Sequence, residues 1–154
     1  MWRAIVLNIS IAAVVMLSAG PTLAQRFSIV ANGEEILDTQ TGLVWRRCAL
    51  GMAWNGSTCE GSPSSLVHQD VLGSATQAAG WRLPNVKELF SIVALDRSPR
   101  IDAVAFPATP GTRFLTVTPF IGSPDKAWCV DFGSGTTTLC ERFIFGTTAA
   151  RFVR

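Results

Sequence analysis

The chain has 154 residues, a formal net charge of +2 and a hydrophobic fraction of 48%. This near balance of basic and acidic residues argues against a nucleic-acid partner, because proteins that bind nucleic acids carry a clustered basic face. The length is that of one ordinary domain with a hydrophobic core of its own.

The segment 1–24 has the pattern of a secretory signal peptide. A basic start at Arg3 precedes an apolar stretch over residues 4–19, and small residues lead to a cleavage site after Ala24. A retained membrane anchor is the alternative, but the apolar stretch is shorter than the roughly 20 residues that a span needs. We therefore expect residues 25–154 to form one exported domain, periplasmic or secreted, with no membrane span after cleavage.

Four cysteines lie in the exported part: Cys48, Cys59, Cys129 and Cys140. An even number of cysteines in an oxidising compartment predicts two disulfides. Three connectivities are possible, and the short spacings favour Cys48–Cys59 with Cys129–Cys140. Each bridge would close a loop of about a dozen residues and stabilise the fold by about 2–3 kcal/mol. A zinc site is the alternative, but the spacings lack the Cys-x-x-Cys pairs typical of structural zinc.

The first predicted element of the domain is a strand over residues 26–30, which contain strand-forming side chains. Residues 35–38 and 43–45 flank the turn-rich segment 39–42, and this pattern predicts a β-hairpin. The segment 49–63 is rich in Gly, Ser, Asn and Thr, which predicts a loop closed by the first disulfide.

Two helices are predicted after this loop. Residues 64–79 place apolar side chains at roughly helical spacing, although Gly73 weakens the helix. The second helix begins at Asn85, a good N-cap, and Glu88 stands three residues later, where a capping box requires it. Its predicted apolar face consists of Val86, Leu89, Phe90 and Val93.

The last part of the chain has the pattern of short strands separated by turns, over residues 114–117, 127–132, 136–140, 142–145 and 150–153. A two-residue turn at Ser134-Gly135 would place Cys129 directly opposite Cys140. Opposed residues in an antiparallel pair lie within disulfide range, so this hairpin and the second disulfide support each other.

Five segments together resemble a known family. They are DTQTGLVWRRC at 38–48, WNGSTCEG at 54–61, GWRLPNVKELFSIV at 80–93, RIDAVAFP at 100–107 and AWCVDFGSG at 127–135. In this order they are similar to the Lcl C-terminal domain family, also called DUF1566. The resemblance covers nearly all of residues 25–154.

The resemblance implies an exported bacterial domain of the α+β class with a C-type-lectin-like fold, in the superfamily of the formylglycine-generating enzymes. In such a fold two helices pack on a small, mostly antiparallel, irregular sheet, and the terminal strands lie close together. The family is named after a collagen-like adhesin whose terminal domain is associated with glycosaminoglycan binding. Many relatives carry a tryptophan in the segment that corresponds to residues 114–119, and its absence here weakens the case for sugar binding through that segment.

No pattern in the sequence is typical of an enzyme. His68 is the only histidine, it stands in no nucleophile motif, and we expect it at a surface or helix position. All four cysteines have local partners, so none is expected to serve formylglycine-type chemistry. We expect no catalysis, no cofactor and no bound metal, and a structural calcium near Asp96 and Asp102 is left open.

The candidate ligand-binding residues are Arg46, Arg47, Trp54 and Arg82. They would contact a polysaccharide or glycosaminoglycan without a calcium-bridged sugar, as in a binding or adhesion module. For Arg82, an ion pair with Glu88 is the alternative. For the whole domain, the alternative is a structural or assembly component of an envelope protein complex, with a protein partner and no glycan ligand.

The tryptophans divide into two groups. Trp54 lies in the disulfide loop beside polar residues, where exposure to a ligand is plausible. Trp45, Trp81 and Trp128 lie in strands or at the approach to a helix, and aromatic side chains in a small domain normally belong to the core.

Overall fold

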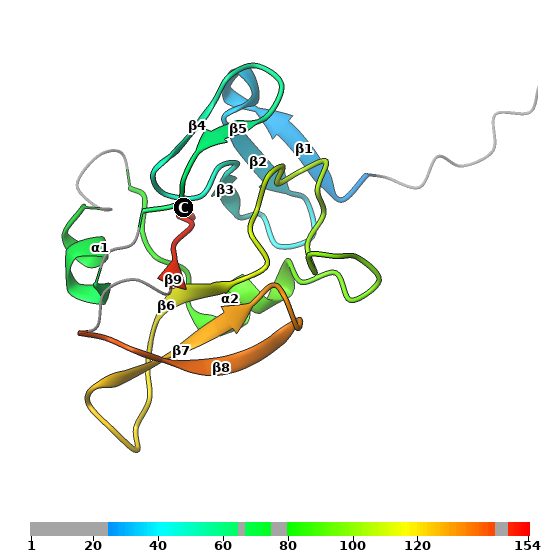
Figure 1. Ribbon diagram of the computed structural model, residues 1–154. Coiled ribbons are helices and arrows are strands. Elements are labelled where there is room, and N and C mark those ends of the chain that lie inside the picture. Colours follow the sequence, from blue (N-terminus) through cyan, green and yellow to red (C-terminus); the bar gives the residue numbers. More distant parts are fainter. Residues whose placement is uncertain (1–24, 65–66, 75–79, 144–147) are drawn as a thin grey trace, which may run out of the picture.

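The structure is a computed structural model that describes residues 25–64, 67–74, 80–143 and 148–154. This part of the chain consists mostly of short strands in small sheets, together with two short helices (Figure 1). The elements are β1 (Phe27–Val30), η1 (Ala31–Gly33), β2 (Glu35–Asp38), β3 (Val44–Arg46), β4 (Met52–Trp54), β5 (Cys59–Gly61), α1 (His68–Ser74), α2 (Val86–Ser91), β6 (Arg113–Pro119), β7 (Lys126–Asp131), β8 (Thr136–Glu141) and β9 (Thr148–Ala149). The predicted signal peptide, residues 1–24, lies outside the described residues.

The first sheet is an antiparallel arrangement of β1, β2 and β3. Ile36 on β2 lies opposite Trp45 on β3, and both side chains are fully buried. The predicted hairpin is therefore confirmed, with its inward-facing apolar residues in the core. Arg26 ties the start of β1 to the end of β2 through two hydrogen bonds to the buried Asp38 carboxylate, at 2.7 and 3.0 Å.

A second hairpin, β4–β5, forms within the segment 49–63, for which the sequence pattern predicts only a loop. Its strands have three residues each. Strands this short show no clear alternation of apolar and polar residues, so the prediction misses them. Cys59 on β5 is bonded to Cys48, and this predicted disulfide attaches the hairpin to the chain just after β3.

The largest sheet has the strand order β8-β7-β6-β9, in which β9 is parallel to β6 and the other pairs are antiparallel. The predicted register of its β7–β8 hairpin is wrong. Asp131 lies opposite Thr136, so four residues form the turn, and Cys129 does not lie directly opposite Cys140. The Asp131 carbonyl accepts the N–H of Gly135, which stabilises this longer turn. The predicted disulfide still forms as a diagonal pair with a Cα–Cα distance of 5.9 Å.

The C-terminal residues connect the first sheet with the approach to α2. Val153 forms isolated bridges to both Trp45 and Arg82. Arg154 exchanges two backbone hydrogen bonds of 2.9 Å with Val44. The end of the chain thus pairs with β3, close to the place where the N-terminal strands lie (Figure 1).

Two of the predicted C-terminal strands need correction. Within 150–153, Val153 forms isolated bridges and there is no regular strand. The regular strand of this region, β9, lies earlier, at Thr148–Ala149. The predicted strand over 142–145 is wrong at Arg142 and Phe143, which lie in a bend. Its remaining residues fall outside the described part of the chain.

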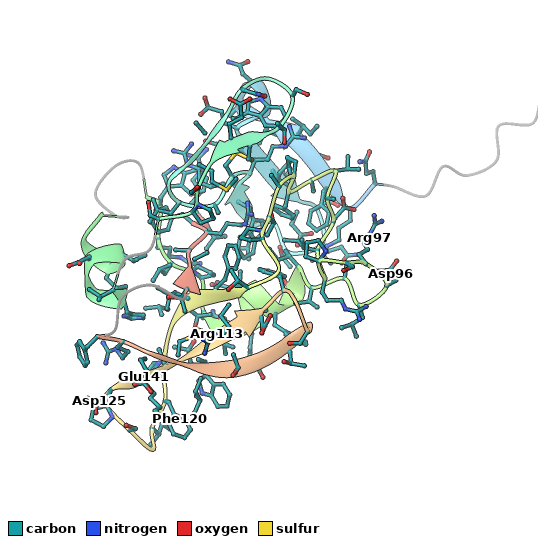
Figure 2. All side chains as sticks on the ribbon, in the orientation of Figure 1. Asp96, Arg97, Arg113, Phe120, Asp125 and Glu141 are labelled. Carbon is teal, nitrogen blue, oxygen red and sulfur yellow. A yellow bond between two sulfur atoms is a disulfide. The ribbon has the colours of Figure 1, made fainter. Side chains whose placement is uncertain are left out.

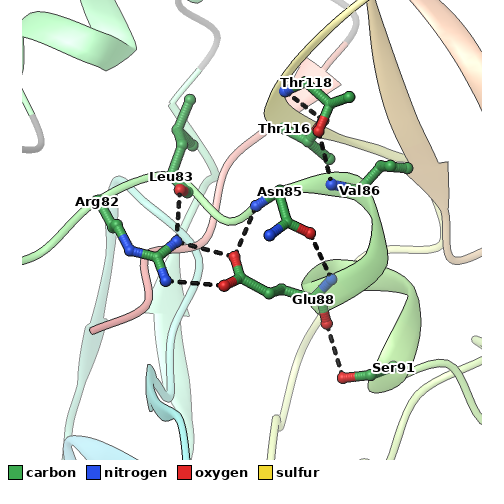
Figure 3. A network of polar contacts seen from close by, with 8 residues as sticks. All are labelled: Arg82, Leu83, Asn85, Val86, Glu88, Ser91, Thr116 and Thr118. Atoms are coloured by element: carbon green, nitrogen blue, oxygen red, sulfur yellow. Dashed lines mark hydrogen bonds and ion pairs between the residues drawn. The ribbon is translucent and has the colours of Figure 1, made fainter.

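Helix α2 begins with the predicted capping box (Figure 3). The side-chain oxygen of Asn85 accepts the N–H of Glu88 at 2.9 Å, and the Glu88 carboxylate accepts the N–H of Asn85 at 2.8 Å. Leu89 is fully buried, but Phe90 is 42% exposed, so the predicted apolar face is wrong at Phe90. The backbone leaves helical geometry at the buried Ile92, which contributes to the core in its place.

Helix α1 confirms the predicted helix over 64–79 at residues 68–74, whereas the described residues Ser64 and Val67 are not helical; residues 65–66 and 75–79 of that prediction lie outside the described residues. Its side chains His68 and Val71 are both buried. None of the helices in the described segments is long and apolar enough to cross a membrane.

The core contains the tryptophans Trp45 and Trp81, as predicted. The prediction for Trp128 is wrong in part, because this side chain is only half-buried and packs edge-to-face on Phe120, with ring centroids 5.7 Å apart. Phe120 lies at the far end of β6, near the protruding β6–β7 turn (Figure 2).

The capping box yields a first prediction. Asn85→Ala removes the side-chain acceptor for the N–H of Glu88, and we expect it to lower the free energy of unfolding by about 1 kcal/mol. Asn85→Ser keeps an oxygen acceptor and serves as the control, with near wild-type stability. Urea titration followed by circular dichroism measures both variants. Equal stability of Asn85→Ala and wild type would contradict a role for the cap.

Candidate ligand-binding cleft

A cleft of about 430 Å³ opens beside the β4–β5 hairpin. Glu34 lines it from the turn between β1 and β2, Arg46 lines it from β3, residues 48–54 line it from the disulfide loop and β4, and Trp81 and Phe152 complete it. We call this feature the Arg46 cleft. Two of the four predicted ligand-binding residues, Arg46 and Trp54, lie in its lining.

The Arg46 guanidinium is oriented, and among the described residues its N–H groups have no hydrogen-bond acceptor within hydrogen-bond distance. Its central carbon lies 4.3 Å from the centroid of the Trp81 ring, a cation–π contact that holds it in place. The nearest carboxylate oxygens, on Glu34 and Glu35, lie 3.6 and 3.8 Å away, which is beyond hydrogen-bond distance. The side chain is 38% exposed, so its N–H groups can reach a ligand in the cleft.

Trp81 supports the cleft rather than offering a free stacking surface. It is 4% exposed, and a second guanidinium, that of Arg154, also lies over its ring at 4.6 Å. Arg154 is itself held by a 2.7 Å ion pair with Glu35. The indole therefore contacts two guanidinium groups, of which only that of Arg46 belongs to the lining of the cleft.

Trp54 bridges the two hairpins that flank the cleft. Its indole nitrogen lies 2.6 Å from the point that a Cβ atom on Gly33 would occupy, so any side chain at residue 33 would collide with the ring. Gly33 also has a φ of +94°, a conformation that favours glycine. On β4, Trp54 is only partly buried, which leaves part of its ring available to a ligand.

Arg47 fixes Trp54 and does not line the Arg46 cleft. It is 6% exposed, and its guanidinium lies 3.8 Å from the centroid of a Trp54 ring. Its N–H groups donate to the carbonyls of Gly33 and Val104, at 3.2 and 2.9 Å. Burial lowers the pKa of Arg47 from its ordinary value. The structure thus gives Arg47 a supporting position.

Arg82 is engaged elsewhere (Figure 3). Both of its terminal nitrogens donate to the Glu88 carboxylate at 2.8 Å, and one also donates to the Leu83 carbonyl at 3.3 Å. The hydrogen bonds from Arg82 lower the pKa of Glu88, and the same bonds raise the pKa of Arg82. The sequence leaves two roles open for Arg82, contact with a ligand and an ion pair with Glu88. The structure shows the ion pair.

Arg151 is a key residue that the sequence patterns do not reveal. It is fully buried and donates to the carbonyls of Arg46 and Arg47 and to the hydroxyl of Thr109. Burial lowers its pKa to about 9. By default an arginine is expected at the surface, and nothing in its neighbours indicates burial. Its contacts hold the backbone from which Arg46 projects.

His68 and the acidic residues of the loop after α2 lie apart from one another in ordinary structural contacts. The described residues contain no group of three or more His, Cys, Asp or Glu side chains able to hold a metal ion. His68 is buried rather than at the surface, its Nε2–H donates a hydrogen bond to the Thr116 carbonyl at 2.8 Å, and burial lowers its pKa. Asp102 accepts the N–H groups of Val104 and Ala105, and Asp96 lies on the outer side of the same loop (Figure 2).

A family model, the Lcl C-terminal domain, matches residues 34–154. The chain belongs to the Lcl C-terminal domain family. Searches of curated proteins and of solved structures found no match. In this Lcl C-terminal domain the matched region contains every residue that lines the Arg46 cleft.

The disulfide beside the cleft yields a second prediction. Replacing Cys48 and Cys59 together by alanine is expected to lower the free energy of unfolding by about 2–3 kcal/mol. The double variant Cys129→Ala/Cys140→Ala is a matched control, because both bridges span a sequence separation of 11. Hydrogen exchange should accelerate in β4 and β5 only for the first variant. Unchanged exchange there would show that the bridge does not hold the hairpin.

The Arg82–Glu88 pair yields a prediction of pH dependence. The pKa of Glu88 in the folded state lies below its ordinary value of 4.5. The Glu88 carboxylate therefore contributes its full stabilisation above pH 4.5. This stabilisation is lost as the pH falls through the pKa of Glu88 in the folded state. Glu88→Gln should lower stability at neutral pH and weaken the acid dependence of unfolding, measured by urea titration at several pH values. An unchanged acid dependence would contradict this assignment.

Proposed function

We propose that this Lcl C-terminal domain is a non-catalytic binding module for an anionic, hydroxyl-rich chain such as a polysaccharide or glycosaminoglycan. The single observation that supports this best is the Arg46 guanidinium, held over Trp81 with unused N–H groups inside a cleft. A planar guanidinium matches a carboxylate or sulfate group through two parallel hydrogen bonds.

The other residues of the Arg46 cleft suit such a ligand. The partly exposed Trp54 ring offers an apolar surface for the carbon face of a sugar. Glu34, whose side chain is 61% exposed, can accept hydrogen bonds from hydroxyl groups. Recognition would proceed through these side chains, without a calcium-bridged sugar.

We also propose that the domain is periplasmic or secreted and that its fold is C-type-lectin-like. Two disulfides are stable in an oxidising compartment, which supports a periplasmic or secreted bacterial protein. Two short helices beside small sheets, with the C-terminus paired to β3, are features expected of a C-type-lectin-like arrangement. Both points remain part of the proposal.

A second candidate function is docking to an envelope protein. The exposed apolar side chains of Ile29 and Val104 flank a smaller cavity of about 240 Å³, whose lining also includes Ile36 and Ile92. Exposed apolar side chains around a hollow are typical of protein contacts. This candidate predicts a protein partner and no glycan binding.

The test is binding of the oxidised domain to a glycan array with sulfated and uronate-bearing chains, followed by affinity measurement on immobilised heparin. Arg46→Ala should weaken heparin binding about tenfold, which is about 1.4 kcal/mol, and added salt should weaken the wild type.

Arg97→Ala is the matched control for Arg46→Ala, because Arg97 is half-exposed and lies on the loop after α2 (Figure 2). The Arg97→Ala variant should bind heparin with wild-type affinity. Adding a calcium chelator should leave the affinity of the wild-type domain for heparin unchanged. A blank array, or equal losses in the two variants, would overturn glycan recognition at this cleft and favour the protein partner.

A further inference from the structure

Trp54 separates the Arg46 cleft from a second, more open hollow of about 530 Å³. The lining of this hollow includes Ile29, Asn32, Gly33 and Gly56, and Trp54 itself lines both depressions. We call it the Asn32 hollow.

The two depressions share two segments of the chain, the turn between β1 and β2 and the β4–β5 hairpin. Along the turn between β1 and β2, Asn32 and Gly33 line the hollow and the adjacent Glu34 lines the cleft. Along the β4–β5 hairpin, residues 52–54 line the cleft, and Trp54 with Gly56 lines the hollow. Trp54 is therefore a ridge with one depression on each side.

This ridge is rigid. The indole of Trp54 packs so closely on Gly33 that no Cβ atom fits between them, and Arg47 stacks on the ring at 3.8 Å. The Cys48–Cys59 bridge anchors the same hairpin at Cys59, which lies directly opposite Trp54. A surface that is already ordered loses little conformational entropy when a ligand binds across it.

The two depressions differ in chemistry. The Arg46 cleft contains an oriented cation and an exposed carboxylate. In the Asn32 hollow the only charged side chain of the lining is Arg47, whose terminal N–H groups are occupied by carbonyls. Asn32 is exposed, and its side-chain amide has no hydrogen-bond partner among the described residues. Ile29, 55% exposed, adds an apolar surface.

We propose that the ligand is a chain several units long that lies across Trp54, with an anionic unit at Arg46 and an uncharged unit in the Asn32 hollow. This inference rests on the proposed function and adds a second binding subsite to it. The amide of Asn32 hydrogen-bonds the uncharged unit, and Ile29 packs against it.

The test uses a disaccharide and an octasaccharide from N-acetylated regions of heparan sulfate as probes, because anionic uronate units alternate there with uncharged N-acetylglucosamine units. Each probe is titrated into the wild-type domain and followed by NMR. Longer anionic chains bind more tightly for general electrostatic reasons, so variants of the hollow decide the question. Asn32→Gly removes the amide without backbone strain, since Asn32 has a φ of +54°, which glycine adopts readily. Ile29→Ala trims the apolar surface, and Ile121→Ala, at a fully exposed isoleucine in the β6–β7 turn, is its matched control.

Asn32→Gly and Ile29→Ala should each weaken octasaccharide binding about fivefold, leave disaccharide binding unchanged and leave the unfolding midpoint within the range of Ile121→Ala. The octasaccharide, and not the disaccharide, should shift the side-chain amide signal of Asn32. Wild-type affinity of both variants for the octasaccharide, with Arg46→Ala still weakened, would overturn the second subsite and leave the proposed function intact. Absence of binding by either probe to the wild-type domain would overturn both.

Discussion

The arrangement around the cleft depends on one buried guanidinium. Arg151 is fully enclosed and donates to the carbonyls at the end of β3 and to Thr109, while its charged group lies over the rings of Phe106 and Phe114. A buried cation is costly unless its hydrogen bonds are satisfied, so these acceptors must remain in place as long as the domain is folded. The C-terminal segment and β3 are thereby held together, and Arg46 projects from a fixed backbone.

The site itself is a series of stacked arginines and tryptophans. Arg46 and Arg154 lie over Trp81, and Arg47 lies over Trp54. In each pair the indole limits the freedom of the guanidinium, and buried carbonyls or nearby carboxylates satisfy part of its hydrogen-bonding capacity. Only Arg46 combines exposure to the cleft with unused N–H groups among the described residues of this set. The difference between a supporting arginine and a contacting one is thus a matter of burial and partners, not of residue type.

Local patterns in the sequence predicted much of the framework. The capping box at Asn85 and Glu88 depends on neighbours three residues apart, and both disulfides join cysteines close in the chain, so short-range rules suffice for them. The β7–β8 register was mispredicted because the side chain of Asp131 stabilises a four-residue turn that spacing alone does not indicate. Phe90 was mispredicted because α2 is too short to present a regular face.

The sequence by itself determined the two disulfides, the start of α2, the first hairpin and the family, because each of these depends on residue types at fixed separations along the chain. The sequence indicates four candidate side chains, but only the tertiary structure shows that they take different places. Arg46 and Trp54 meet at one cleft, Arg47 supports Trp54 from below the surface, and Arg82 pairs with Glu88. The physical reason is distance along the chain: Arg151 meets the carbonyl of Arg46 across 105 positions, and no local pattern encodes such a contact.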